Sequence, residues 1–242
     1  MTTKIALVTG ANKGIGLDIA RGLGKAGVTV LVGARSAERG EAAAETLRSE
    51  GLEAEFVRLD VTDAATIAAA AKHIEEAHGR LDILVNNAGI IDRREGWMPT
   101  ETPVDAVRNT FETNVFGVIA VTNALVGLLE RAAEPRIVNV TSEVGSFAMM
   151  TNPESPYYPL RGVGYQASKS ALNAVTIAYA KTFADTAFRV NAVNPGYCAT
   201  DLNGNAGHRT PEEGSRAAIR MALIGADGPT GTFESEEGPH PW

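Results

Sequence analysis

The stretch KIALVTGANKGIGLDIARGLGKAG, residues 4–27, decides the fold of this chain. It opens with an apolar run typical of a β-strand, passes through a turn with three glycines, and continues as a helical segment. Such glycines let a pyrophosphate approach backbone N–H groups at a helix N-terminus, where the helix dipole favours negative charge. The stretch therefore predicts a strand, a dinucleotide-binding loop and a helix. The expected binding residues of this glycine loop are Gly10, Asn12, Lys13, Gly14, Ile15 and Gly16.

Short β-rich runs alternate with alanine-rich helical stretches along most of the remaining chain. Several of these runs are apolar on both faces, as expected for strands that helices cover on each side. The sequence predicts the α/β class, with a doubly wound parallel sheet (Rossmann fold), helices on both faces, and one domain over residues 1–242. The expected strands are residues 4–10, 28–34, 53–59, 81–87, 136–142 and 188–194, with a seventh short strand near the C-terminus.

Three helix starts are marked by capping residues. Asp63 is expected to cap the helix that runs through IAAAAKHIEEA, and Thr102 is expected to cap a helix with Pro103 in its first turn. Thr210 and Glu213 fit a capping box, in which the two side chains each bond to the other residue's backbone N–H.

The composition disfavours several classes of protein. The formal net charge is -7 and the sequence pI is about 5.2, so no basic stripe is available for nucleic acid or for an anionic membrane. The first residues hold too few consecutive apolar side chains for a signal peptide or a membrane span, so a cytoplasmic protein is expected. One cysteine cannot form an internal disulfide, and the four histidines lack metal-ligand spacing, so no metal is expected.

The end of the second strand indicates which dinucleotide binds. An acidic residue about 20 positions beyond the glycines would bond to a ribose 2′-hydroxyl, but the chain reads VGARS over residues 32–36, without an acid. Arg35 offers a guanidinium there, and Lys13 lies within the glycine loop, so both cations are expected to bind the 2′-phosphate of NADP(H). The alternative is that both are solvated surface cations.

A tyrosine and a lysine stand four residues apart in GYQASKSALNAV, residues 164–175. On a helix, Tyr165 and Lys169 share one face and can act on the same substrate atom. The usual pKa of a phenol, about 10, is too high for ready proton exchange at neutral pH, and a nearby ammonium is expected to lower it. The pair is therefore a candidate acid and base, although such spacing also arises by chance on protein surfaces.

Seven short motifs occur in order along nearly the whole chain: TGANKGIG at 9–16, Asp60-Val61, NNAG at 86–89, TNVFG around Asn114, TSEVG with Ser142, YQASK at 165–169 and NPGYCATDL at 194–202. In this order they resemble the short-chain dehydrogenase/reductase family, and most of all its carbonyl-reductase-like members.

The resemblance implies NADPH-dependent reduction of a small ketone or aldehyde to an alcohol, in a reversible reaction. The nicotinamide would supply hydride, Tyr165 the proton, and Lys169 would lower the tyrosine pKa and bind the nicotinamide ribose. Ser142 would bind the substrate oxygen, and Asn114 would hold a water that relays protons. The other implied cofactor contacts are Asp60, Val61, Asn87, Ala88, Gly89, Pro195, Gly196 and Thr200.

Other activities remain open at this point. Members of the same family reduce carrier-bound β-ketoacyl groups or oxidise secondary alcohols, and a non-catalytic NADP-binding sensor would also keep the glycine loop. The long helices expected at 103–130 and 164–185 resemble the surface through which family members associate, so a homo-oligomer is expected.

Two irregular stretches follow strand ends, where such folds bind ligands. Residues 147–164 look like an insertion, with Met149, Met150, Tyr157 and Tyr158 that either line a substrate pocket or pack against the protein body. Residues 197–209 resemble a mobile substrate loop.

Overall fold

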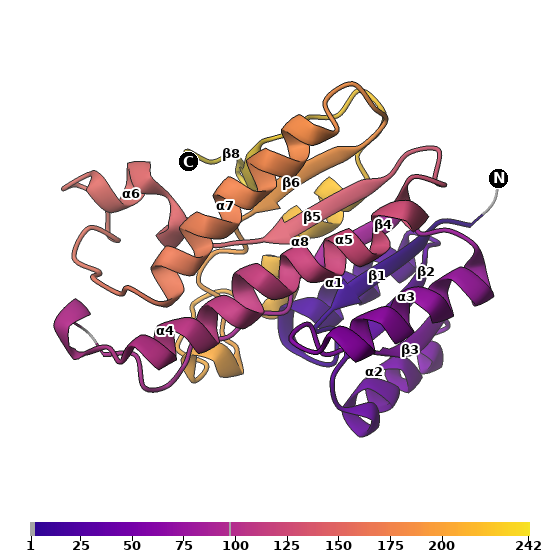
Figure 1. Ribbon diagram of the computed structural model, residues 1–242, viewed down its shortest axis with the longest axis horizontal. Coiled ribbons are helices and arrows are strands. Elements are labelled where there is room, and N and C mark those ends of the chain that lie inside the picture. Colours follow the sequence, from indigo (N-terminus) through magenta and orange to yellow (C-terminus); the bar gives the residue numbers. More distant parts are fainter. Residues whose placement is uncertain (1–2, 97) are drawn as a thin grey trace.

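The computed structural model describes residues 3–96 and 98–242, which form one eight-stranded sheet with helices on both of its faces (Figure 1). The strands are β1 Ile5–Thr9, β2 Thr29–Ala34, β3 Ala54–Arg58, β4 Ile83–Asn86, β5 Arg136–Val140, β6 Arg189–Val193, β7 Phe233–Ser235 and β8 Gly238–Pro239. They lie in the order β3-β2-β1-β4-β5-β6-β7-β8, and neighbours are parallel except for β7 and β8. The predicted doubly wound parallel sheet is therefore confirmed.

The helices divide between the two faces of the sheet. They are α1 Gly14–Lys25, α2 Ala37–Ser49, α3 Ala64–His78, α4 Val104–Phe111, α5 Gly117–Leu129, α6 Phe147–Thr151, α7 Tyr165–Thr182 and α8 Pro211–Ala222. On one face, buried residues of α1, α2 and α8, such as Leu47 and Met221, pack in one apolar cluster with the sheet. On the other face, α3, α5 and α7 contribute to a second cluster that includes Ile74, Leu125 and Ala180.

The strand order reverses between β1 and β4. From β1 the chain moves outward to β2 and β3, then returns to the other side of β1 as β4. Open α/β sheets bind ligands at the carboxyl ends of strands at such a reversal. The glycine loop after β1 and the segment that follows β4 therefore flank the expected cofactor site.

The capping predictions are confirmed at two of three helix starts. Asp63 accepts a hydrogen bond from Ala65 N at 2.9 Å, and Thr210 and Glu213 form the complete capping box. The third prediction is wrong, because α4 begins after Pro103 without a side-chain cap. The hydroxyl of Thr102 turns back instead and bonds to the backbone of Gly96 and Met98.

The segments α4 and α5 form one continuous helix, because a π-helical turn at Glu112–Phe116 joins them. Over Val104–Leu129 this helix is long and apolar enough to cross a membrane, but half of it is buried in the protein. The core helices of soluble proteins are often as long and as apolar as this one. The length and composition of this helix are therefore weak evidence for a membrane span.

Four buried polar side chains join the sheet to the helices α5 and α7. The amide of Asn86 on β4 donates hydrogen bonds to Thr122 on α5 and to Asn139 on β5, at 3.2 and 2.9 Å. The amide of Asn139 donates in turn to Thr176 on α7, at 2.9 Å. Because all four side chains are buried, this network fixes how α7 sits on the sheet.

We predict that Asn139→Ala lowers the free energy of unfolding by about 2 kcal/mol, because it leaves buried polar groups without partners. Urea denaturation measures this loss. The matched control is Asn123→Ala, because Asn123 is exposed on α5 and bonds to the hydroxyl of Tyr179. Equal losses in the two variants would contradict a special role for the buried network.

Candidate active site

The glycine loop adopts a backbone that needs glycine at the three expected positions. Gly10 and Gly14 have positive φ angles of 67° and 55°, a region that other residues rarely adopt. Gly16 has ordinary helical geometry, but a Cβ there would overlap Asn87 Nδ2 and Gly10 O. The loop and the segment after β4 thus approach each other as closely as their backbones allow.

The N-terminus of α1 is open to an anionic ligand. Its N-cap residue, Lys13, makes no side-chain capping bond, and no acidic residue lies in the first turn. The first N–H groups of a helix need acceptors, and a phosphate supplies them together with a charge that the helix dipole favours. This end of the helix therefore fits the pyrophosphate of a dinucleotide. Asn12 is half-buried in the loop, and Ile15 packs against the core.

The segment that follows β4 is tied to the end of β1. The hydroxyl of Thr9 accepts hydrogen bonds from the N–H groups of Asn87 and Ala88, each at 3.0 Å. The Asn87 amide donates back to Thr9 O at 2.9 Å. Gly89 lies where a Cβ would contact Lys169 Nζ and Asn114 Oδ1, at 3.6 and 3.4 Å. The predicted cofactor segment 87–89 therefore reaches the candidate catalytic residues.

The two expected phosphate-binding cations stand on the glycine loop and directly after β2, and a backbone hydrogen bond joins these two segments. Ala11 N donates to Gly33 O at 3.1 Å, which holds the glycine loop beside the end of β2, next to Arg35. Arg35 is exposed. Lys13 is also largely exposed, but it forms an ion pair with Asp201.

Two of the implied cofactor contacts, Asp60 and Val61, follow β3. Asp60 Oδ1 accepts hydrogen bonds from the backbone and the hydroxyl of Thr62, at 3.0 and 2.8 Å. Val61 packs against Gly117 at the start of α5, where a Cβ would lie 2.8 Å from Val61 O.

The candidate catalytic pair lies in the first two turns of α7, where Lys169 Nζ is 5.6 Å from the centre of the Tyr165 ring. Lys169 is only 4% exposed, and its ammonium donates to Val140 O at 2.9 Å. Burial lowers the pKa of Lys169 to about 8. The N-terminal end of α7 carries a carboxylate that the sequence did not reveal, since Tyr165 N donates to Glu95 Oε2 at 2.9 Å.

The tyrosine of the free protein is a weak acid. Burial raises the pKa of Tyr165 to about 12, a hydrogen bond with Ser142 counteracts part of this, and the negative charges of Glu143 and Glu95 raise the pKa further. This is the opposite of the lowering that we expected from Lys169. The reason is that desolvation of the phenol dominates, and the lysine beside it is itself desolvated.

Asn114 lies in the π-helical turn between α4 and α5. It is 1% exposed, and it bonds to both backbone groups of Ile90: Ile90 N donates to Oδ1, and Nδ2 donates to Ile90 O, each at 2.9 Å. Nδ2 also donates to the hydroxyl of Ser168 at 3.0 Å. Single π-helical turns occur frequently at functional sites, and this one aims the amide toward α7.

Ser142 is held close to α7 by the turn that follows it. Ser142 begins a 3₁₀ turn, Glu143–Gly145, and its hydroxyl accepts from Val144 N at 3.4 Å. Gly145 packs directly on α7, since a Cβ there would lie 2.7 Å from the carbonyl carbon of Lys169. The structure thus brings Asn114, Ser142, Tyr165 and Lys169 together from three separate segments, since Tyr165 and Lys169 both belong to α7.

The implied cofactor contacts Pro195, Gly196 and Thr200 lie after β6. Gly196 has a positive φ of 74°, and its N–H donates to Asn194 Oδ1 at 2.9 Å. Pro195 lies between them, and its carbonyl accepts from the thiol of Cys198. Thr200 reaches the glycine loop, because a Cβ on Gly14 would lie 3.6 Å from Thr200 Cγ2. The two walls of the predicted cofactor cleft therefore meet at Gly14 and Thr200.

This arrangement of loops matches a known family. A family model described as short chain dehydrogenase matches residues 4–211. The chain belongs to the short-chain dehydrogenase family. This confirms the resemblance seen in the sequence, and it makes the protein an oxidoreductase of a family that binds a nicotinamide cofactor.

Individual relatives align with almost the whole length of this chain. It is 31% identical to (+)-neomenthol dehydrogenase of Capsicum annuum, with 96% of this chain and 95% of the relative aligned. Salutaridine reductase from Papaver somniferum has a similar solved structure, with a TM-score of 0.83 and 30% identity over 95% of this chain and 99% of that one. The solved NADPH-bound carbonyl reductase from chicken fatty liver has a TM-score of 0.86 and 25% identity, with both chains fully covered.

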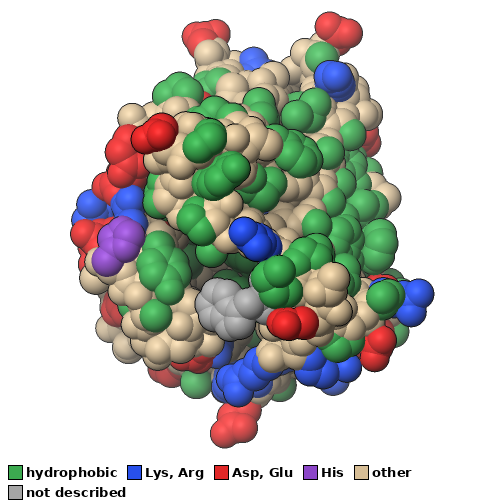
Figure 2. Space-filling view, turned by 90° about the vertical axis from the view of Figure 1, so that its left-hand side faces the viewer, with side chains coloured by type: hydrophobic (Ala, Val, Ile, Leu, Met, Phe, Trp, Pro, Cys, Tyr) green, Lys and Arg blue, Asp and Glu red, His purple; other side chains and the backbone are tan. Residues whose placement is uncertain are grey.

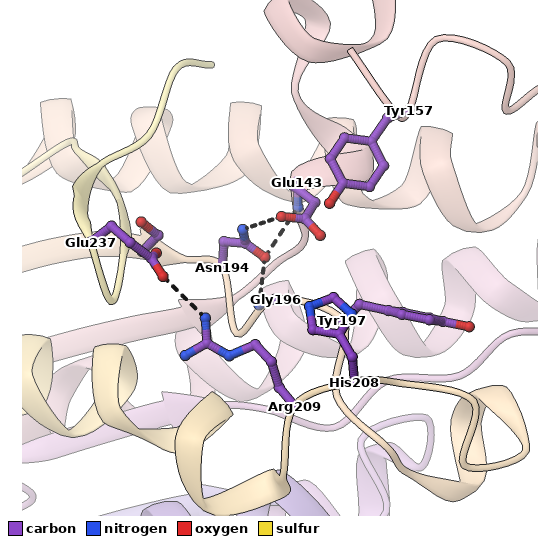
Figure 3. A pocket seen from close by; sticks show the side chains of 9 residues that line it. Glu143, Tyr157, Asn194, Gly196, Tyr197, His208, Arg209 and Glu237 are labelled. Atoms are coloured by element: carbon purple, nitrogen blue, oxygen red, sulfur yellow. Dashed lines mark hydrogen bonds and ion pairs between the residues drawn. The ribbon is translucent and has the colours of Figure 1, made fainter.

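A polar cavity of about 250 Å³ lies next to Glu143, the residue that follows Ser142 (Figure 3). It is lined by Glu143, Tyr157, Asn194, Gly196, Tyr197, His208, Arg209, Ser235 and Glu237. Of the insertion residues expected to line a substrate pocket, Tyr157 is in this set. Glu143 and Asn194 were missed as candidates, although Glu143 directly follows Ser142 in the sequence.

The other insertion residues lie elsewhere. Met150 lines a second, apolar hollow with Phe147 of α6 and small residues of α7, and Tyr158 is half exposed. Hydrophobic side chains gather at the end of the molecule that carries α4 and α6 (Figure 2). The hydrophobic substrate pocket expected from Met150 and Tyr158 is therefore not the cavity next to Glu143. Within residues 3–96 and 98–242, no cluster of His, Cys, Asp or Glu could hold a metal ion.

We predict that Lys169→Met changes how the stability of the free protein depends on pH. Burial depresses the lysine pKa from 10.5 to about 8, so between these values the unfolded chain binds more protons than the folded one. The lysine should therefore contribute a rise in wild-type stability of about 3 kcal/mol across the whole window, of which about 2 kcal/mol falls between neutral pH and pH 9.5, and this contribution should vanish in the variant.

Urea denaturation of the cofactor-free protein at neutral pH and at about pH 9.5 measures this difference. Lys169→Met also loses the hydrogen bond to Val140 O. This loss lowers stability equally at both pH values, so it does not affect the difference between them. Lys181→Met is the matched control, because Lys181 is exposed on the same helix. A variant Lys169→Met that keeps the wild-type pH dependence would show that the lysine is not desolvated.

Proposed function

We propose that this dehydrogenase reduces ketones or aldehydes to alcohols with NADPH, in a reversible reaction. The observation that carries the proposal is the cluster of Ser142, Tyr165 and the buried Lys169 beside Gly89 and the open N-terminus of α1. We further propose that residues 1–242 act as one catalytic domain in the cytoplasm, on a small-molecule substrate.

When bound, the dinucleotide supplies the hydride that the carbonyl carbon receives. The Tyr165 phenol gives its proton to the carbonyl oxygen, and the hydroxyl of Ser142 donates a hydrogen bond to the same oxygen as charge develops on it. Lys169 lies beneath the tyrosine ring and has donors left over for the ribose, since an ammonium has three and Val140 O takes one. Asn114 holds the loop at Ile90 against α7, next to the candidate catalytic pair.

The protonation state of Tyr165 in the free protein fits a proton donor. With a pKa raised to about 12, Tyr165 carries its proton at neutral pH, and so weak an acid transfers it to an oxygen that gains negative charge as the hydride arrives. Alcohol oxidation needs the phenolate, which a positively charged oxidised nicotinamide and the ammonium of Lys169 would stabilise. Oxidation of a secondary alcohol is therefore the second candidate, and the name of the relative (+)-neomenthol dehydrogenase supports it.

Two lines of support favour NADP(H) over NAD(H). The end of β2 carries the exposed Arg35 and no acid to bind a 2′-hydroxyl. Among similar solved structures, the chicken carbonyl reductase is described as NADPH-bound, and a gluconate 5-dehydrogenase from Burkholderia cenocepacia is described in complex with NADP. Lys13 pairs with Asp201, so a 2′-phosphate would compete with this carboxylate for the ammonium.

We also propose that the protein forms a homo-oligomer through the helix Val104–Leu129, of which only half is buried in the protein. Val104 and Phe116 on this helix are exposed hydrophobic side chains. Light scattering of the purified protein would report a monomer if this surface stays free.

We predict that Tyr165→Phe abolishes NADPH oxidation by ketones while NADPH binding persists, because the variant lacks only the proton donor. The rate should fall by at least about a hundredfold. The assay follows NADPH absorbance over a panel of ketones, aldehydes, β-keto esters and a β-ketoacyl thioester, and fluorescence measures NADPH binding. Full activity in the variant would refute the mechanism, and NADPH binding without turnover of any compound would favour a sensor.

We predict that Arg35→Ala raises KM for NADPH by about tenfold and leaves KM for NADH unchanged, because only NADPH has the 2′-phosphate. Lys25→Ala is the control, since Lys25 is exposed at the opposite end of α1. If Arg35→Ala binds both cofactors as wild type does, Arg35 is a solvated surface cation and does not bind the 2′-phosphate.

A further inference from the structure

Glu143 places a carboxylate in the polar cavity next to the candidate proton donor. It follows Ser142 directly and belongs to the 3₁₀ turn that packs on α7. Figure 3 shows its carboxylate between the Tyr157 hydroxyl on one side and the rings of Tyr197 and His208 on the other. A substrate whose carbonyl reaches Tyr165 would therefore extend other groups past Glu143.

The side chain of Glu143 is held in this position by Asn194. The Asn194 amide donates to Glu143 Oε2 at 2.8 Å, and Asn194 Oδ1 accepts from the N–H groups of Glu143 and Gly196, at 3.3 and 2.9 Å. These bonds use one carboxylate oxygen and link the carboxylate to the segment that precedes Gly196. The carboxylate is thus oriented before any substrate binds, which reduces the entropy that binding costs.

The charge of Glu143 has no cationic partner among the described residues. None of their lysine, arginine or histidine side chains lies within ion-pair distance of it. Arg209 lines the same cavity, but it forms ion pairs with Glu236 and Glu237. The cavity therefore carries an excess of negative charge.

Neighbouring groups respond to this charge. Burial, followed by the hydrogen bond and the charge of Glu143, raises the pKa of Tyr157 well above its usual value. The same carboxylate also contributes to the raised pKa of Tyr165. A positive charge placed beside Glu143 would offset both effects.

Aromatic rings also line the cavity. Tyr157 and Tyr197 line it, and the Tyr197 ring lies 6.0 Å from the ring of His208. A carboxylate among tyrosine rings suits an alkylammonium group, which the anion attracts and which can pack on the ring faces.

We propose that Glu143 is a specificity residue that selects carbonyl substrates carrying a protonated amine. The inference rests on the proposed carbonyl-reducing function and deepens it by naming the substrate class. Neutral ketones remain substrates, and the effect of Glu143 on the pKa of Tyr165 is the same for both ketones, so it cancels when the two are compared within one variant.

The test compares two ketones of the same shape that differ by one charge. They are 4′-(dimethylaminomethyl)acetophenone, which is protonated at neutral pH, and the neutral 4′-isobutylacetophenone. Wild type should favour the cation by about tenfold in kcat/KM at low salt, mostly through KM, and Glu143→Gln should abolish this preference. Glutamine keeps an oxygen for the Asn194 amide, so the variant changes charge with little change in shape.

Glu154→Gln is the matched control, because Glu154 is exposed in the insertion 147–164, close to Glu143 in the sequence, and lies outside the cavity. It should retain the wild-type preference. The inference is overturned if wild type does not favour the cation, or if Glu143→Gln favours it as strongly as wild type does.

Calorimetric titration of both ketones into the NADP⁺-loaded proteins separates this inference from the proposed function. Tighter binding of the cation by wild type alone supports the role of Glu143, even if neither ketone is turned over. In that case absence of turnover counts only against the proposed reaction. Equal binding of the two ketones by wild type refutes the inference, even if both are reduced.

Discussion

The contact between Thr9 and Asn87 holds together the edge of the sheet on which the rest of the site depends. The hydroxyl of Thr9 accepts two N–H groups of the segment after β4, and the Asn87 amide bonds back to Thr9 O. The same amide occupies the space that a side chain on Gly16 would need. One contact therefore sets the turn after β1, the start of α1 and the position of Gly89, which in turn lies against Lys169. The parallel sheet supplies the edge, and this contact gives it a fixed shape.

The protonation states of the candidate catalytic residues depend on how far each side chain is removed from water and on the charges around it. In the free protein a buried lysine and a half-buried tyrosine lie side by side, and desolvation disfavours the charged form of each. Glu95 and Glu143 add negative charge near the phenol, which keeps its proton in place. The unfavourable burial is tolerated because the surrounding framework, including the network around Asn139, holds α7 against the sheet.

Local patterns were enough to predict the strands, the glycine loop and two helix caps, because these depend on residues close together in the sequence. The cap at Thr102 was mispredicted because its hydroxyl found backbone partners in the preceding turn. Glu95 could not be predicted, since its bond to Tyr165 joins residues 70 positions apart. The raised pKa of Tyr165 also escaped prediction, because desolvation depends on the packed tertiary structure. For Glu143, adjacency to Ser142 was the available signal.

The ion pair of Lys13 and Asp201 joins the glycine loop to the segment after β6, across the cleft in which the dinucleotide is expected to lie. An incoming phosphate has to compete with the carboxylate for the same ammonium. Added salt would weaken this ion pair, and it would also screen the attraction between the phosphate and the exposed cations. Cofactor capture would then be fastest at an intermediate ionic strength, so the physiological salt level itself becomes a parameter of the enzyme's rate.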